Sequence, residues 1–356
     1  MRVLRRKDIV EIIKRRIANG EYAMRGIPSE RELAEDVGVA RMTARKALQI
    51  LVDEGILIRT PEGGRLELAP DAKATKHCVG LLVPTLTSPD MANWESELRR
   101  AASKLDIMVR VIYYASWDDL ALRDAMDNLD GLFLIPRADL PPPWLARKFR
   151  RHPCPMVCLG MDLTELELPS LVVFQPVFIR QLLDHLLELG HTHIDCVNTQ
   201  GNNPVTIQRM EQWQFWRELH GFKGDLINEK LKNLSPARSA RKLIHEKIER
   251  GALQATAIFC TTLPAARGTI RALVDHGLTP GKDVSVCTVD GEHQADLATP
   301  SITCLERGDT VAYLQSLLRW MISGQDWQGS LLMEISNIKL IPGESTGPAP
   351  SPASTT

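Results

Sequence analysis

The stretch Ile27 to Arg59, IPSERELAEDVGVARMTARKALQILVDEGILIR, decides the fold of the N-terminal part of the chain. Ser29 followed by Glu32 is the capping-box pattern that begins a helix, and Gly38 supplies the left-handed residue that ends one. A second helical run then extends from Ala40 to about Glu54. The sequence therefore predicts two helices joined by a tight turn.

The second of these helices has two unlike faces. Helical spacing turns four apolar residues toward a core, namely Ala44, Ala47, Leu48 and Leu51. The opposite face then carries Arg41, Met42, Arg45, Lys46 and Gln49. An arginine donates in parallel to guanine O6 and N7 or to a phosphate, and a helix fits the major groove of B-form DNA. This face is therefore predicted to read DNA. For such a run in isolation, a solvated helix is the alternative.

The flanking sequence favours the DNA-binding interpretation. A preceding run places Ile9, Ile12, Ile13 and Ile17 at near-helical spacing between basic residues. After the second helix, residues 56–59 predict a strand, residues 60–64 a turn and residues 65–68 a returning strand. Three helices with a two-stranded wing make a complete DNA-binding unit, which we expect at residues 1–69.

About residues 4–69 closely resemble the winged helix-turn-helix of the GntR family of bacterial transcription factors. The family's pattern of Leu or Ile, Pro, Ser, Glu, Arg, Glu, Leu and Ala stands here as Ile27 to Ala34. Its recognition-helix pattern ends here in Arg45, Ala47, Leu48, Leu51, Glu54 and Gly55. The chain departs from the family at Met42, in the wing PEGGRLEL, and at Ala40, which forgoes a cap worth about 0.5–2 kcal/mol. The resemblance and the exposed helix face together imply DNA contacts by Arg31, Arg41, Met42, Thr43, Arg45 and Lys46, and by Gly63 and Gly64 at the wing tip.

Composition restricts the class of protein. The 356 residues leave room for one small and one large domain. No apolar run reaches the roughly 18–20 residues of a membrane span, and the N-terminus lacks the uninterrupted apolar segment of a secretion signal. The seven cysteines are scattered through apolar runs, as reduced thiols are. We therefore expect a cytoplasmic protein with no membrane partner.

The formal net charge of −1 hides a difference between the two parts of the chain. Residues 1–70 hold 14 Lys and Arg against 11 Asp and Glu, or +3, and the remainder holds 29 against 33, or −4. DNA affinity is therefore expected to depend on a few well-placed cations and on dimerisation. Residues 70–76 predict a linker, and residues 344–356, rich in Pro, Ser and Thr, predict a disordered tail.

Between linker and tail, at residues 77–343, apolar strand-like runs alternate with helical runs, which is typical of parallel α/β sheets. Strands are expected at residues 79–84, 107–114, 131–136, 155–160, 170–174, 193–198, 256–260 and 284–290. This order predicts two doubly wound lobes with a ligand at the strand ends that face the crevice.

About residues 77–347 resemble the LacI-type effector domain, which is related to periplasmic sugar-binding proteins. The stretches that carry the likeness are residues 187–191, 283–290, 300–303 and 343–347. The resemblance implies an α/β two-lobed, periplasmic-binding-protein-like domain whose lobes are joined by crossings near residues 174, 304 and 326. A GntR-like head on a LacI-like body resembles the arabinose repressor group, and it implies a regulator that binds an effector.

The same resemblance implies effector contacts in the cleft. Arg209 matches a ligand-binding arginine, and Asp290 matches an aspartate that accepts from sugar hydroxyls. Ser88 and Asp90 lie in the matching loop of the first lobe, and Trp94 beyond it offers an apolar face for a sugar ring. Thr262 stands where the family has an Asn-Asp pair, and Gly291 where it has an acidic residue. The effector is therefore expected to be a small molecule, with a sugar or sugar derivative as one class and a vestigial cleft as the alternative.

Other motifs carry less chemistry. His191 and His193 have the look of a metal pair, and His152, Cys154 and Cys158 of a zinc set, but turn formation and core packing explain them better. We expect no metal, no cofactor and no catalysis, although an enzyme-bodied GntR relative is a rival reading. The function expected from the whole chain is a bacterial repressor that binds a palindromic operator as a homodimer. A body that serves only for dimerisation is the other alternative.

Overall fold

The computed structural model describes residues 6–18, 22, 26–60, 65–69, 77–85, 89–291, 293–336 and 338–350. The predicted wing-tip residues Gly63 and Gly64, the predicted linker 70–76 and the predicted effector contact Ser88 lie outside these ranges. Within the described part, no helix is long and apolar enough to cross a membrane.

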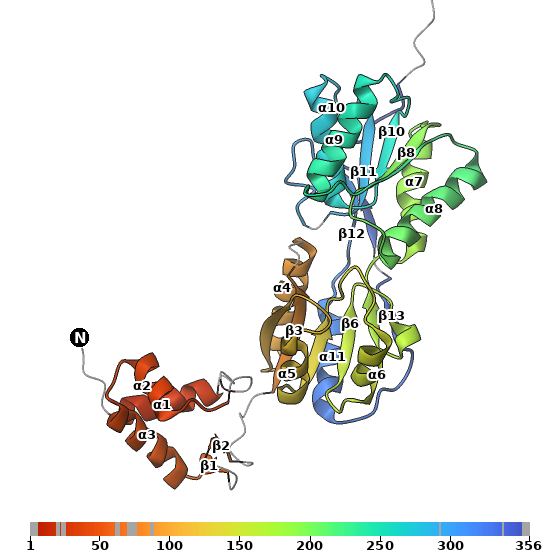
Figure 1. Cartoon of the computed structure of the whole chain (residues 1–356). Helices are drawn as coiled ribbons and strands as arrows, with labels where there is room; N and C mark the ends of the chain where they lie inside the picture. The colour runs from red at the N-terminus through yellow and green to blue at the C-terminus, as the bar shows by residue number, and fades with distance from the viewer. Residues whose placement is uncertain are drawn as a thin grey trace, which may run out of the picture.

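The head consists of three helices and a two-stranded antiparallel hairpin (Figure 1). Its elements are α1 (Arg6–Ala18), α2 (Glu30–Val37), α3 (Arg41–Asp53), β1 (Leu57–Arg59) and β2 (Leu66–Leu68). The capping box is confirmed, because the Glu32 backbone N–H donates to Ser29 Oγ at 3.3 Å and the Ser29 N–H donates to Glu32 Oε2 at 2.8 Å. Gly38 closes α2 with φ 67°, and Ala40 makes no side-chain cap.

The apolar stripes of the three helices meet in one core. The predicted inward face of α3, Ala44, Ala47, Leu48 and Leu51, is fully buried against Ile9, Ile13, Leu33 and Leu57. Burial of a Leu or Ile side chain contributes about 1.5–3 kcal/mol, so this core fixes which side of α3 remains exposed.

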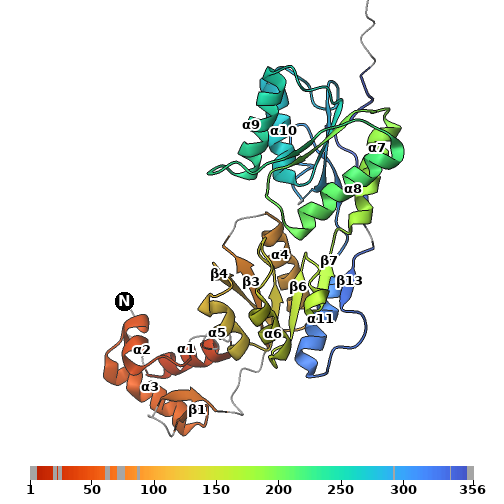
Figure 2. The ribbon, with the colours of Figure 1, turned by 45° about the vertical axis from the view of Figure 1, so that its right-hand side comes forward.

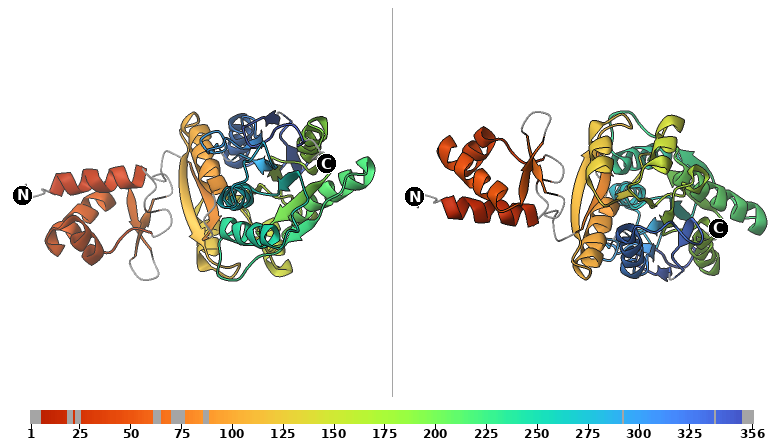
Figure 3. Two further views of the ribbon diagram at one scale, coloured as in Figure 1. Left: turned by 90° about the horizontal axis from the view of Figure 1, so that it is seen from above. Right: turned by 90° about the horizontal axis from the view of Figure 1, so that it is seen from below.

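Figure 3 shows the head beside the body when the molecule is seen from above and from below.

The body contains two six-stranded sheets, one in each lobe. The first has the order β13-β7-β6-β5-β3-β4 and the second β14-β12-β11-β10-β8-β9. The strands of the first are β3 (Cys78–Pro84), β4 (Met108–Tyr114), β5 (Gly131–Leu134), β6 (Met156–Leu159), β7 (Ser170–Val172) and β13 (Leu332–Glu334). Those of the second are β8 (Ile194–Asn198), β9 (Leu226–Asn228), β10 (Ala257–Cys260), β11 (Ser285–Asp290), β12 (Thr303–Glu306) and β14 (Lys339–Ile341). All pairings in both sheets are parallel except that of β14 with β12.

Helices cover the sheets of both lobes, as Figures 1 and 2 show. The first lobe has α4 (Pro89–Ser103), α5 (Leu120–Asn128), α6 (Pro143–Arg151) and α11 (Val311–Ser323). The second has α7 (Ile179–Glu188), α8 (Pro204–His220), α9 (Pro236–Glu249) and α10 (Leu263–Asp275). Short 3-10 turns occur at η2 (Thr164–Leu166) and η3 (Pro176–Phe178). Central strands such as β3, β5 and β8 are buried along their whole length, as expected for parallel strands covered on both faces.

The chain passes between the lobes three times. It crosses after β7, again between β12 and α11, and finally between β13 and β14. The first two crossings lie close to the expected residues 174 and 304, but the expectation of a third near residue 326 was wrong. Residues 332–334 still pair with β7 in the first sheet, so the last crossing follows Glu334.

The expectation of a disordered tail from residue 344 was also wrong for residues 344–350, which pack on the second lobe. Ser345 is fully buried, and its hydroxyl donates to the Val286 carbonyl at 2.6 Å and accepts from the Thr303 N–H at 2.9 Å. A Cβ on Gly347 would lie 2.1 Å from the Gly281 carbonyl oxygen, so the small residues that suggested disorder allow close backbone contact. Residues 351–356 lie outside the described ranges.

Candidate functional site

The outer face of α3 is the first candidate site. Arg41, Met42, Arg45, Lys46 and Gln49 are all exposed, and Thr43 is half-buried at the edge of the core. The side chains of Arg41 and Arg45 are 71% and 62% exposed. The face predicted to read DNA is therefore open to solvent and opposite the buried alanines and leucines.

One carboxylate lies between the two arginines. Glu30 at the start of α2 is 3.4 Å from Arg41 Nε and 3.6 Å from Arg45 Nε. Arg31 pairs with Glu35 at 3.0 Å on an exposed face. Exposed pairs of this kind contribute about 0–1 kcal/mol, so phosphates or base edges can replace Glu30 at little cost.

Two further arginines, absent from the predicted contacts, complete this surface. Arg59 ends β1 and Arg65 precedes β2, and both line a groove shared with Arg31 and Arg41. Arg59 Nη2 also donates to Gln49 Oε1 at 3.3 Å, which ties the wing to α3. These two arginines could have been found from the sequence, as basic residues that flank the predicted hairpin. A wing beside a recognition helix can contact the same stretch of phosphates.

The second candidate site is a cavity of about 120 Å³ between the lobes. Four of the predicted effector residues, Asp90, Trp94, Arg209 and Asp290, line it together. Asp90 and Trp94 come from α4 in the first lobe, Arg209 from α8 and Asp290 from the end of β11 in the second. The lining is completed by residues of the lobes and crossings that were not predicted, including Asp162, Phe174, Gln175, Gln208, Arg307 and Glu334.

Thr262 does not line this cavity. It is buried at the N-cap of α10, directly after Thr261. The backbone carbonyl of Thr261 accepts a hydrogen bond from Arg209 Nη1 at 2.6 Å. The segment therefore orients Arg209 through its backbone.

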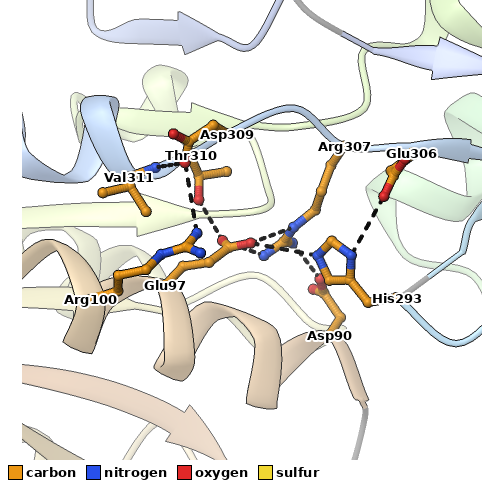
Figure 4. A network of polar contacts seen from close by, with 9 residues as sticks. All are labelled: Asp90, Glu97, Arg100, His293, Glu306, Arg307, Asp309, Thr310 and Val311. Atoms are coloured by element: carbon orange, nitrogen blue, oxygen red, sulfur yellow. Dashed lines mark hydrogen bonds and ion pairs between the residues drawn. The ribbon is translucent and has the colours of Figure 1, made fainter.

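A buried ionic network forms one wall of the cavity (Figure 4). Arg307, in the second crossing, donates to Glu97 through Nη2 at 2.6 Å and Nε at 3.2 Å, and to Asp90 through Nη1 at 2.8 Å. The Thr310 hydroxyl donates to the same Glu97 carboxylate. The Arg307 guanidinium carbon lies 4.5 Å from the centre of the Trp94 ring. The network thus ties α4 of the first lobe to the crossing that leads out of the second.

Burial and charge act in opposite directions in this network. Burial raises the pKa of Asp90 above its ordinary value, although the guanidiniums of Arg307 and Arg209 act to lower it. Burial acts to lower the pKa of Arg307, but the carboxylates of Asp90 and Glu97 outweigh it and raise that pKa. Arg307 therefore stays charged inside the protein.

The position of Arg307 changes the role predicted for Trp94. The indole is fully buried and Arg307 lies over its face, so a sugar could stack on that face only if Arg307 moved. Glu97 and Arg307 were missed by the sequence analysis. Glu97 follows Trp94 by three residues and so falls on the buried face of α4, and a charge in that position signals a buried partner.

The weaker sequence motifs have structural roles here. His191 Nδ1 is 2.9 Å from Thr256 Oγ1 and its Nε2 is 3.0 Å from Ser285 Oγ, so this histidine fastens the turn before β8. Cys154 and Cys158 are buried in the first lobe, and burial raises the pKa of the Cys154 thiol to about 12.

Comparison with known proteins agrees with the division of the chain into a head and a body. Residues 5–66 match the family described as bacterial regulatory proteins, gntR family, and residues 183–346 match the periplasmic binding protein-like domain. The HTH-type transcriptional repressor NagR of Bacillus subtilis (strain 168) is 46% identical over 64 residues, which are 18% of this chain. That match spans about a quarter, 26%, of NagR.

Solved structures resemble the body. A LacI family transcriptional regulator from Enterococcus faecium with bound ribose superposes with a TM-score of 0.63 at 16% identity, covering 76% of this chain and 99% of that one. The lac repressor dimer bound to operator and the anti-inducer ONPF gives 0.61 at 19% identity, covering 77% and 95%. At these identities the likeness shows the fold.

The fold and the matches define a two-part architecture, a winged helix-turn-helix followed by a two-lobed periplasmic-binding-protein-like domain. The head matches the GntR family model, and the body has the fold seen in LacI family regulators. The head matches bacterial regulatory proteins, among them the NagR repressor, and the body matches a periplasmic binding protein-like domain.

Proposed function

We propose that this chain is a cytoplasmic, ligand-responsive repressor that binds a palindromic operator as a homodimer, with a sugar or a related small molecule as its effector. The observation that carries the proposal is the two-faced helix α3, whose buried alanines and leucines hold Arg41 and Arg45 outward. The separate matches of residues 5–66 and residues 183–346 support the combination of a DNA-binding head with an effector-binding body.

The DNA-binding part of the proposal rests on a basic surface of the right shape. Arg41 at the start of α3, Arg31 of α2 and the wing arginines Arg59 and Arg65 line one groove. In a dimer, each α3 would enter a major groove, and the two half-sites would be about 34–36 Å apart or a multiple of that distance. The lac repressor, whose body has the same fold, forms a dimer on its operator.

The effector part rests on a cavity to which both lobes contribute. A ligand that contacts Asp90 on one side and Arg209 and Asp290 on the other would stabilise one arrangement of the lobes. The cavity of about 120 Å³ is smaller than the roughly 300–1,000 Å³ of most ligand sites, so binding would require the lobes or Arg307 to shift. Coupling to DNA binding needs a preference of about 1–3 kcal/mol for that arrangement.

The test of DNA binding is selection of a duplex from a random pool, followed by titration of Arg41→Ala and Arg45→Ala. Each variant is expected to weaken binding to the selected duplex by about 1–3 kcal/mol if the residue reads a base. Arg271→Ala is the matched control, since Arg271 is an equally exposed, ion-paired helix arginine of the body. Unchanged affinity in both head variants would refute the assignment of α3.

The test of effector binding is a thermal-shift screen of sugars and related metabolites on the wild-type chain. A compound that raises the melting temperature should lose this effect with Arg209→Ala and with Asp290→Ala, while both variants keep their affinity for DNA. The alternative, a body that serves only for dimerisation, predicts that no compound changes operator affinity.

A further inference from the structure

The interlobe cavity carries an excess of negative charge. Its lining contains the carboxylates of Asp90, Asp162, Asp290 and Glu334 and the guanidiniums of Arg209 and Arg307, which gives a formal charge of −2. Glu97 lies directly behind Arg307 and adds a further negative charge to this wall.

The positive charges of the cavity are held by protein acceptors. The Arg307 side chain is only 2% exposed, and all three of its nitrogens donate to Glu97 or Asp90. Arg209 directs Nη1 to the Thr261 carbonyl and lies 6.0 Å from the centre of the Phe174 ring. An anionic ligand would therefore have to displace Glu97 or Asp90 to reach the Arg307 guanidinium.

The carboxylates are more accessible to a ligand. Asp162 and Glu334 are exposed at the rim of the cavity, both from the first lobe. The Asp162 carboxylate accepts from the N–H and the hydroxyl of Thr164, which fixes its position without neutralising its charge. Burial raises the pKa of Asp90, so a positive ligand charge beside it would favour its ionised form.

A separate observation indicates that a ligand belongs here. Trp94 lines the cavity and is fully buried, and its Nε1–H, which is near the Asp90 carboxylate, forms no hydrogen bond of ordinary geometry among the described residues. A buried donor that forms no good hydrogen bond costs free energy. A ligand hydroxyl can accept from this N–H while donating to a carboxylate.

We infer that the effector is a small hydroxylated molecule that carries a positively charged amino group, and that phosphorylated and carboxylated compounds are excluded from the cleft. This inference rests on the proposed function of the cleft. The lining predicts that an ammonium group lies at the Asp162 and Glu334 rim and that hydroxyls face Trp94, Asp90 and Asp290.

The experiment compares compounds that share a skeleton and differ in charge. Melting temperatures of the full chain are measured with millimolar glucosamine, glucose and glucose 6-phosphate, and with serinol, glycerol and glycerol 3-phosphate. The inference expects an amino compound to give the largest shift and both phosphates to give none. It is overturned if a phosphorylated or neutral compound gives the largest shift, or if neither amino compound stabilises the protein.

Rim variants test the position of the charge. The double variant Asp162→Asn with Glu334→Gln should weaken the amino compound about tenfold, and its neutral parent much less, because loss of two nearby charges affects only a charged ligand. Glu165→Gln is the control, since it removes an exposed carboxylate that does not line the cavity. Equal weakening of both compounds would overturn the inference. The proposed function fails by a different result, the absence of sequence preference in the duplex selection.

Discussion

Replacement of Arg307 by methionine tests the buried network most directly. The variant removes three hydrogen bonds and leaves the Glu97 carboxylate, 9% exposed, without its guanidinium partner. Breaking a buried ion pair from one side costs about 3–5 kcal/mol. Asp90 is 34% exposed and Thr310 still donates to Glu97, so we expect the lower end, about 3 kcal/mol.

Urea unfolding at neutral pH, followed by tryptophan fluorescence, measures this change in the free energy of unfolding. Arg100→Met is the matched control on α4, because Arg100 and Asp309 are 61% and 73% exposed and 3.7 Å apart. Such a surface pair contributes about 0–1 kcal/mol. The double variant Arg307→Met with Glu97→Met should be more stable than Arg307→Met alone, since the Glu97 carboxylate is then no longer buried without its arginine.

Two results would refute this reasoning. The first is an Arg307→Met variant no less stable than Arg100→Met. The second is a double variant whose loss equals the sum of the two single losses, because coupled partners must deviate from additivity.

Three further predictions follow from local contacts. Glu30→Gln removes the carboxylate shared by Arg41 and Arg45 and should tighten non-specific duplex binding about two- to fivefold in fluorescence anisotropy; weaker binding would show that Glu30 orients the arginines. Asp119 caps α5, and two backbone N–H groups lower its pKa, so Asp119→Ala should cost about 0.5–2 kcal/mol at neutral pH. That stabilisation is present above the ordinary value of 3.8 and is lost as the pH falls through the lower folded value, so a cost independent of pH in urea titrations would contradict it. Burial lowers the pKa of His191, so the unfolded chain takes up the proton first and stability should fall as the pH drops below 6.5; His191→Gln should flatten this part of the pH profile, and an unchanged slope would reject the assignment.

The head was predictable almost residue by residue because its signals are local. The capping box, the glycine after α2 and the apolar spacing of α3 each act within a turn or two of helix. Most buried strands of the body were equally visible as continuous apolar runs. β9, β12, β13 and β14 were not among the expected strands. Three of them, β9, β13 and β14, have three residues each that are only partly buried and are strands only through pairing with a distant neighbour. The fourth, β12, is the short segment Thr303–Glu306, in which two apolar residues stand between polar ones.

The cleft was predictable only in part for the same reason. The family resemblance indicated Asp90, Trp94, Arg209 and Asp290, and the structure brings these four residues together. The pair of Glu97 and Arg307 is separated by 210 residues, so no local pattern relates one to the other. The packed segment after Gly343 was mistaken for a tail because its burial depends on backbone contacts and not on apolar side chains.

The chain passes between the lobes three times, and this determines when each lobe can finish folding during synthesis. β13 completes one sheet and β14 the other, and both come from residues 332–341. Neither lobe can finish folding until nearly the whole chain has been synthesised, whereas the contacts of the head are complete within the first 69 residues. A nascent chain halted before Leu332 would present the bare edges of β7 and β12, which are open to pairing with other chains and to capture by chaperones.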